Sequence, residues 1–142
     1  MIGIDTNILV YAHRADSLSH TTAFERMQTL VNEADYLIPV HVFCEFFATV
    51  TNHRIYKRPS TIEEASHQIV QWMAGDGFCL GVDSGAVLAE WMRLVTLHRV
   101  SGGPAYDARI AAVCLIHGVT EFWSADRDFS KYQSLNVVNP LA

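Results

Sequence analysis

Four carboxylates in this chain border or interrupt apolar segments, where an acidic side chain is unfavourable. Asp5 follows an apolar stretch at the N-terminus, Glu45 lies within a phenylalanine-rich segment, Asp107 precedes a long apolar run, and Asp126 follows two aromatic residues. Burying a carboxylate destabilises the fold unless the charge is paired or holds a metal. No basic residue flanks Asp5 or Glu45 in the sequence. Acids from separate segments without a cationic partner are the oxygen ligands that a hard divalent cation requires.

Each of these acids also has a simpler interpretation when it is taken alone. Asp5 and Asp107 stand near expected helix starts and Asp126 stands in an expected turn, all of which favour aspartate. Glu45 cannot be a cap because its helix continues on both sides, so its alternative is a buried ion pair with a distant residue such as Arg109. The metal site is favoured because it accounts for all four acids together.

Length and composition favour one globular domain spanning residues 1–142. Half of the residues are hydrophobic and 18% are charged, which is typical of a folded chain rather than a disordered one. The apolar runs are shorter than the roughly 20 residues of a membrane span, so we expect a soluble cytoplasmic protein that does not contact membranes. Three widely spaced cysteines (Cys44, Cys79 and Cys114) are expected to be reduced core residues, and no Cys/His zinc spacing occurs.

Apolar strands alternate with helical segments along the chain. Strands are predicted over 1–4, 36–38, 78–82, 119–123 and 135–138. Helices are predicted after Asp5, over 21–34, 40–51 and 62–74, after Asp83 with residues 87–95 inside it, and from Pro104 to Gly118. The helix over 40–51 is apolar nearly all round and is expected to be buried. Asp83 is expected to cap the helix that follows it. This alternation predicts an α/β fold with a central, mainly parallel sheet flanked by helices on both faces.

The expected fold brings the four acids toward one edge of the sheet. Ligands of parallel sheets bind beyond the carboxyl ends of the strands. Asp5 and Asp126 fall at that edge, and Asp107 lies in the first turn of a helix that can reach it. Glu45 joins them if its helix passes beside the same edge.

Four motifs in this order resemble the PIN-domain ribonucleases, and most closely the VapC-type toxins of toxin–antitoxin pairs. They are Ile4–Leu9, Glu45 in its apolar helix, Tyr106–Ala112, and Ser124–Phe129. The resemblance covers essentially the whole chain and implies a single PIN-like domain. Many relatives have His where this chain has Tyr106, and Thr where it has Ser124. Both replacements keep a hydrogen-bonding group.

The resemblance implies an endoribonuclease that depends on Mg²⁺ or Mn²⁺ and leaves a 3′-hydroxyl and a 5′-phosphate. Asp5, Glu45 and Asp107 are assigned as the primary metal ligands, direct or through water, and Asp126 as the acid that completes the site. Three further residues are assigned to the surroundings of the metal: Thr6, Ser124 and Asp128. Thr6 and Ser124 are expected to orient a carboxylate or a water. Capping is an equally good interpretation of Thr6, as a turn or cap role is of Asp128.

RNA binding requires basic side chains, because most contacts to nucleic acids are made to phosphates. The densest basic stretch is Arg54, Lys57 and Arg58, with Tyr56 between them for base stacking. Arg14 is a further candidate for the same groove. The alternative is an ordinary solvated loop. The net charge of −5 would disfavour an RNA partner, but bound cations would offset several of the acids.

The resemblance also implies protein partners. VapC-like proteins are generally homodimers, and each is neutralised by a cognate antitoxin whose C-terminal segment lies along an apolar groove and can push a basic side chain into the acidic site. The sequence locates neither interface. His41, His67, His98 and His117 are interpreted as helix-surface or helix-end residues.

Three other functions compete with the ribonuclease. A phosphoacceptor receiver domain needs an adjacent acidic pair and a late lysine after a strand, and a dehalogenase-type phosphotransferase needs an aspartate where Asn7 stands. The remaining alternative is a catalytically silent PIN-fold RNA-binding or scaffold module. The presence of all four acids argues against this silent module.

Overall fold

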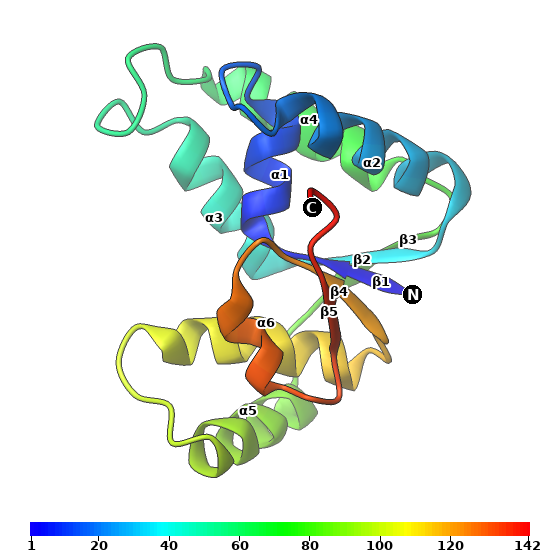
Figure 1. Cartoon of the computed structure of the whole chain (residues 1–142), viewed down its shortest axis with the longest axis vertical. Coiled ribbons are helices and arrows are strands. Elements are labelled where there is room, and N and C mark those ends of the chain that lie inside the picture. Colours follow the sequence, from blue (N-terminus) through cyan, green and yellow to red (C-terminus); the bar gives the residue numbers. More distant parts are fainter.

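The computed structural model describes residues 1–142 as alternating strands and helices (Figure 1). The elements are, in chain order, β1 (Ile2–Ile4), α1 (Thr6–His13), α2 (His20–Glu33), β2 (Tyr36–Pro39), α3 (Val40–Val50), α4 (Ile62–Met73), β3 (Phe78–Gly81), α5 (Gly85–Leu97), α6 (Pro104–Ile116), β4 (Glu121–Trp123), a 3₁₀ helix (Arg127–Lys131) and β5 (Asn136–Val138). The predicted α/β class is confirmed.

The five strands form one sheet in the order β3-β2-β1-β4-β5, and every pair of neighbours is parallel. The chain therefore builds the sheet outward from β1 in one direction, through β2 and β3, and then returns to add β4 and β5 on the other side. Between β1 and β4 the strand order reverses. In parallel sheets this reversal opens a crevice at the carboxyl ends of the two strands.

Helices cover both faces of the sheet (Figure 1): α1, α2 and α4 lie on one side, and α5 and α6 on the other. Strands β1 and β2 are nearly all buried, as expected for a parallel sheet enclosed on both faces. The buried residues form one continuous hydrophobic core. This core fixes the positions of the loops at the carboxyl edge. No helix is of a length and hydrophobicity that would let it cross a membrane.

Side-chain caps set the starts of α1 and α4. Asp5 caps α1 by accepting a hydrogen bond from the backbone N–H of Thr6, and Thr61 and Glu64 form a reciprocal capping box on α4. The predicted cap of α5 is wrong by one residue. Ser84 caps that helix through the backbone N–H of Val87, whereas the carboxylate of Asp83 binds Arg109. An ion-pair partner from α6 outcompetes the capping role of Asp83.

Two other expectations about local structure are wrong. Helix α3 is not buried all round, because Val40, Cys44 and Ala48 share one exposed face at four-residue spacing. Cys44 is therefore exposed rather than in the core, unlike the buried Cys114. The 3₁₀ helix Arg127–Lys131 was not predicted, since its polar sequence is typical of a turn. It forms because Asp126 caps it and the Phe129 side chain is buried.

Close packing at Gly81 in β3 generates a test of this architecture. A Cβ atom on Gly81 would lie 2.8 Å from a methyl group of Val113 in α6 and 3.0 Å from the backbone of Pro39. We expect Gly81→Ala to lower the free energy of unfolding by about 1–3 kcal/mol through overpacking. The matched control is Gly85→Ala at the start of α5, where a Cβ would meet no atom within 4 Å. Urea denaturation should show no loss of stability for the control, and equal losses would contradict this packing.

Candidate active site

The candidate site lies at the reversal of strand order. Ile4 and Trp123 are paired in the β1–β4 register, and the backbone N–H of Asp5 donates to the carbonyl of Trp123 at 2.9 Å. Asp5 and Ser124 therefore leave adjacent strands side by side. The topology alone places residues that are 119 positions apart in the sequence within hydrogen-bonding distance.

The carboxylate of Asp5 is the buried centre of the site, and the residue is 5% exposed. Its Oδ1 accepts the N–H of Thr6 at 2.7 Å, and its Oδ2 accepts the hydroxyl of Ser124 at 2.6 Å. The Asn7 side chain donates to the same Oδ2 at 3.2 Å. These donors fix the orientation of the carboxylate and leave it without a cationic partner.

Glu45 reaches the site from α3. The hydroxyl of Thr6 donates to Oε2 of Glu45 at 2.7 Å, so Thr6 links two of the predicted ligands through its backbone N–H and its side chain. On the other side, Oε1 of Glu45 lies 2.8 Å from Nε2 of His41, one helical turn earlier. The Glu45 side chain is 38% exposed, so it is a rim residue of the site rather than a buried one.

All four predicted acids line one cavity of about 310 Å³. Asp107 comes from the first turn of α6, and Asp126 from the cap of the 3₁₀ helix. Thr6, Asn7, Val10, Tyr11, Thr49 and Phe129 complete the lining. Ser124 lies beneath the cavity wall, where it accepts the backbone N–H of Asp126 at 2.9 Å. Asp128 is exposed and lies outside the lining, although its charge acts on Asp107.

The electrostatics of the cavity are those of crowded acids. Burial raises the pKa of Asp5 from 3.8 to about 6, against the lowering effect of its hydrogen bonds from Ser124 and Thr6. The charges of Asp107 and Glu45 make smaller contributions to this raised pKa. The pKa of Asp107 is also raised, first by burial and then by the charges of Asp126 and Glu45. The acids therefore interact through a shared cavity and repel one another there.

The donor set suits a hard cation that keeps part of its water shell. No group of three or more His, Cys, Asp or Glu side chains is arranged to hold a metal ion by protein atoms alone. Mg²⁺ takes only one or two carboxylates directly and retains several waters. The cavity offers oxygen donors, a buried carboxylate without a basic partner, and no lining Lys or Arg. The residues present thus fit a hydrated divalent ion.

Two residues of the site were missed by sequence reasoning. Asn7 was not assigned to the site, but its amide joins the two strand ends by donating to Asp5 and accepting the N–H of Ala125. His41 was interpreted as a surface residue, yet its side chain is 18% exposed and contacts Glu45. The four-residue spacing of His41 and Glu45 was an available signal for this contact. The expected alternative partner of Glu45, Arg109, binds Asp83 and His41 instead.

The basic loop after α3 is held by Arg14. The guanidinium of Arg14 donates to both carboxylate oxygens of Asp16 and to the carbonyl of Arg58, and stacks 3.9 Å from the centre of the Tyr56 ring. Arg14 therefore anchors the loop to the end of α1. Arg54, Lys57 and Arg58 are exposed, and none of them has an acidic partner.

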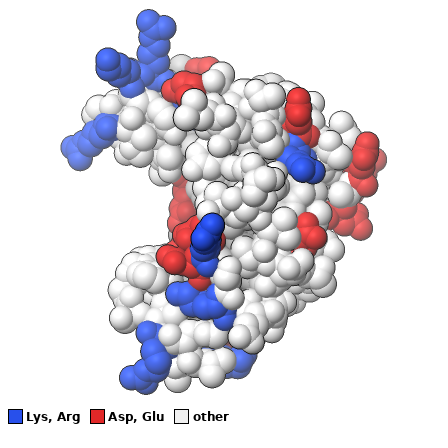
Figure 2. Space-filling view, viewed as in Figure 1, with Lys and Arg blue, Asp and Glu red and all other residues white.

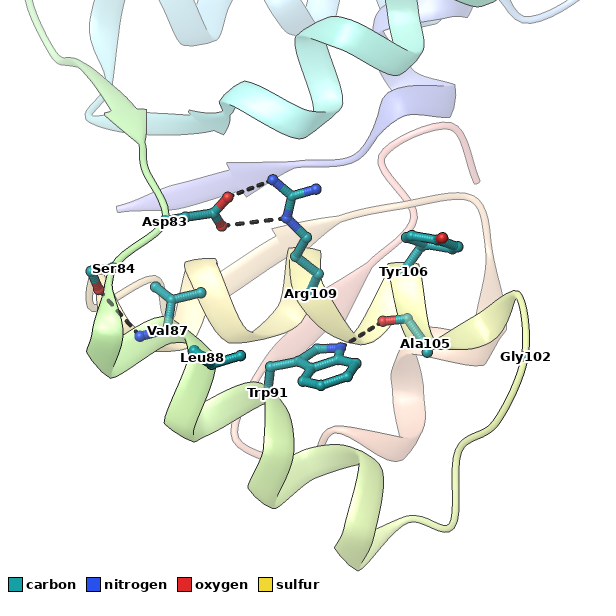
Figure 3. Close-up of a pocket in the computed structure, with 9 residues that line it drawn as sticks. All are labelled: Asp83, Ser84, Val87, Leu88, Trp91, Gly102, Ala105, Tyr106 and Arg109. Atoms are coloured by element: carbon teal, nitrogen blue, oxygen red, sulfur yellow. Dashed lines mark hydrogen bonds and ion pairs between the residues drawn. The ribbon is translucent and has the colours of Figure 1, made fainter.

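A larger cavity of about 540 Å³ lies between α5 and α6 (Figure 3) and shares no lining residue with the acidic cavity. Val87, Leu88, Trp91 and Tyr106 supply most of its apolar surface, and the Asp83–Arg109 pair closes one end. The Trp91 indole is tied to the carbonyl of Ala105 at 2.8 Å. This cavity has one carboxylate, already neutralised, so it lacks the chemistry of the acidic cavity.

A parallel sheet in the order 3-2-1-4-5, with four acids collected at its point of reversal, defines an α/β protein with an acidic pocket at the carboxyl edge of the sheet. The PIN domain family model matches residues 2–135, and the chain belongs to this family. Ribonuclease VapC43 of Mycobacterium tuberculosis is 32% identical over 99% of this chain and 96% of its own length.

Solved structures show the same fold at low sequence identity. Mycobacterium tuberculosis VapC20, described as a sarcin-ricin loop cleaving toxin, matches with a TM-score of 0.71 and 17% identity over 96% of this chain and 98% of its own. VapBC2 of Rickettsia felis, bound to a promoter DNA fragment, matches with a TM-score of 0.70 and 16% identity over 98% of each chain.

The raised pKa of Asp5 predicts how the variant Asp5→Asn changes stability with pH. A folded pKa of about 6 against 3.8 means that the ionised carboxylate costs about 2–3 kcal/mol above pH 6. That cost declines as pH falls from about 6 to 4, because the folded state then takes up a proton before the unfolded state does. Asn removes the charge but disturbs the bonds to Oδ2, so we expect a net stabilisation of about 1 kcal/mol at pH 7.5.

Urea denaturation in EDTA at pH 7.5, 5 and 4 measures this effect. The cost of the charge falls by about half between pH 7.5 and 5, while the disturbed hydrogen bonds of the variant remain. The advantage of Asp5→Asn should therefore be lost near pH 5, and the variant should be less stable than the wild type at pH 4. Glu25→Gln on the exposed face of α2 is the control and should show no such trend. A constant difference between Asp5→Asn and the wild type at all three pH values would contradict a buried, ionised Asp5.

Proposed function

We propose that the protein is a VapC-type toxin, an endoribonuclease that depends on Mg²⁺ or Mn²⁺ and is neutralised by a cognate antitoxin. One observation supports this most directly: Asp5, Glu45, Asp107 and Asp126 come from four separate segments and line one cavity. The relatives named as ribonucleases align over nearly the whole chain, so the likeness includes all four segments.

Each residue of the cavity has a distinct task in this function. Asp5, Glu45 and Asp107 would hold the ion, directly or through its waters, and Asp126 would complete the acidic lining of the same cavity. A bound divalent ion lowers the pKa of water and neutralises charge on the phosphate during in-line attack. The hydroxyl of Thr6 donates to Glu45 and the hydroxyl of Ser124 donates to Asp5. These hydrogen bonds fix the orientation of the two carboxylates. No protein nucleophile is needed.

The charge distribution supports RNA as the substrate. Figure 2 shows acidic atoms within a recess between two arms of the molecule, and Lys and Arg atoms projecting from the tip of the upper arm. In the same orientation, that tip is formed by the loop after α3 (Figure 1). Its exposed basic residues are Arg54, Lys57 and Arg58. Phosphates of a strand would bind at the loop while one phosphate enters the recess.

An acidic recess also suits an antitoxin. In the absence of metal the crowded carboxylates repel one another, so an inserted Arg or Lys side chain from another protein would relieve that repulsion. The VapBC2 structure of Rickettsia felis provides a precedent for a toxin–antitoxin complex on this fold. A homodimer remains part of the proposal because the family resemblance implies it.

The alternative is a catalytically silent PIN-fold module that binds RNA or serves as a scaffold. Such a module needs the fold and the basic loop but has no use for mutually repelling acids. The elevated pKa values of Asp5 and Asp107 mark groups that destabilise the apoprotein. A cavity of this kind favours catalysis, because function commonly retains destabilising groups at a site.

Metal binding and cleavage should be lost together when a ligand is neutralised. We expect 1 mM Mn²⁺ to raise the melting temperature of the wild type relative to EDTA by several degrees, through binding to the folded state only. Asp5→Asn and Asp107→Asn should lose that shift and reduce RNA cleavage at least about 100-fold. Thermal denaturation and sequencing of RNA ends after induction measure the two effects.

The control for both measurements is Asp76→Asn, an exposed acid in the turn between α4 and β3. It should keep the metal shift and the cleavage. Cleavage by Asp107→Asn at the wild-type rate would refute its assignment as a ligand. A metal-induced shift in the wild type without any cut RNA would favour the silent module.

The basic loop should contribute to RNA affinity by binding phosphates. In the Asp107→Asn background, which prevents cutting, replacing Arg54, Lys57 and Arg58 by Ala should weaken single-stranded RNA binding. The slope of log affinity against log salt should decrease by about 0.7 for each phosphate that the variant no longer neutralises. Arg26→Ala with Arg93→Ala is the control, with two charges removed outside the cavity lining. Identical slopes for the loop variant and the control would show that the loop does not bind RNA phosphates.

A further inference from the structure

We infer that His41 and Arg109 are positioning residues that hold Glu45 at the acidic cavity, an inference that rests on the proposed metal-dependent function. The structure links Asp83, Arg109, His41 and Glu45 in one chain of polar contacts. The chain starts in the turn before α5, crosses α6 and ends on α3. It connects the wall of the larger apolar cavity with the candidate metal site.

The outer end of the chain is a fixed guanidinium. Asp83 accepts Nη2 and Nε of Arg109 at 2.5 and 3.4 Å. The third nitrogen of Arg109 points away from Asp83 (Figure 3) and lies 3.1 Å from Nδ1 of His41. Two contacts to one carboxylate set the plane of the guanidinium, so the direction of the remaining nitrogen is set as well.

This contact determines which nitrogen of His41 carries a proton. Arginine offers only donors, so Nδ1 of His41 must accept, and the ring proton is placed on Nε2. Nε2 is buried and lies 2.8 Å from Oε1 of Glu45, although the N–H direction is too bent for a well-formed hydrogen bond. No other polar partner is within reach of Nε2. Glu45 is therefore the only acceptor that this N–H can use.

The ring of His41 is also restrained in orientation. It lies nearly parallel to the ring of Tyr106, with an interplanar angle of 18° and a centroid separation of 6.4 Å. Tyr106 lies in the first turn of α6, so its ring faces His41 from the neighbouring helix. Stacking and the Arg109 contact together restrict rotation of the imidazole.

Glu45 needs such a restraint more than the other acids do. Its side chain is 38% exposed, whereas Asp5 is buried and held by three donors. Thr6 contacts one oxygen of Glu45 and His41 contacts the other. A ligand held from both oxygens loses less freedom when an ion binds. Without His41, Glu45 would be free to turn toward solvent.

The experiment compares His41→Phe, which keeps an aromatic ring beside Tyr106 but has no ring nitrogen, with His41→Gln, which keeps an N–H donor. Isothermal titration with Mn²⁺ alone is the first readout, and cleavage of a synthetic RNA carrying the mapped cut site is the second. We expect His41→Phe to weaken Mn²⁺ binding and slow cleavage about 10- to 100-fold. RNA affinity in EDTA should be unchanged, and His41→Gln should recover most of both losses.

A second pair of variants tests the outer end of the chain. Asp83→Asn loosens Arg109 and should weaken Mn²⁺ binding, whereas Glu90→Gln should not. Glu90 also accepts two hydrogen bonds from an arginine, Arg93 on the same helix α5. Neither residue of that pair lines the acidic cavity. Because Asp83 and Glu90 are both acids paired with arginine outside the acidic cavity, a general effect of the removed charge would appear in both variants.

The outcomes separate the two proposals. Wild-type Mn²⁺ affinity in His41→Phe, with an active wild type, would overturn the positioning role and leave the nuclease proposal standing. His41→Gln as weak as His41→Phe would also overturn it, since the ring and not the N–H would then matter. A wild-type protein that neither binds Mn²⁺ nor cuts RNA would overturn both.

Discussion

The burial of Asp5 between the ends of β1 and β4 is the interaction on which the site depends. The reversal of strand order opens the crevice there, and Asp5 enters it as a helix cap whose second oxygen is held by Ser124. The same residue thus starts α1, joins two strands and supplies a desolvated carboxylate. A charge buried this deeply is unfavourable on its own, because burial and the neighbouring acids raise its pKa to about 6. A bound cation would remove that unfavourable term.

The four acids differ in how rigidly the fold holds them, and the difference follows from the elements that carry them. Asp5 is fixed by the sheet, and Asp107 by the first turn of a helix whose inner face is buried. Asp126 is committed to capping the 3₁₀ helix. Glu45 stands at the rim on a helix with one exposed face, and polar contacts from Thr6 and His41 substitute for the packing that it lacks. The acid at the rim, Glu45, is therefore the one with the longest chain of supporting contacts.

Sequence patterns predict the local parts of this architecture and fail where a partner comes from elsewhere in the chain. The strands follow from apolar periodicity, and the convergence of the acids follows from the rule for parallel sheets. The cap of α5 was misplaced because Arg109, 26 residues away, binds Asp83. Cys44 was misplaced because an apolar helix at the edge of the fold leaves one face exposed. The roles of Asn7 and Arg14 depend on contacts with residues 118 and 44 positions away, which no local pattern contains.

An acidic protein can act on RNA if its charges are separated in space. The net charge is −5, yet four of the acids are confined to one recess, and the exposed basic residues of the loop after α3 stand apart from them. Arg14 makes that separation persistent, because it binds Asp16 and the loop backbone together and so prevents the acid from pairing with Arg58. The long-range field of the apoprotein then repels RNA at the recess, and a divalent ion reverses the field at that point. A bound ion would thus supply the chemistry and would also raise the affinity of the recess for RNA. This double role would account for the presence of repelling acids and an unpaired basic loop in the same small fold.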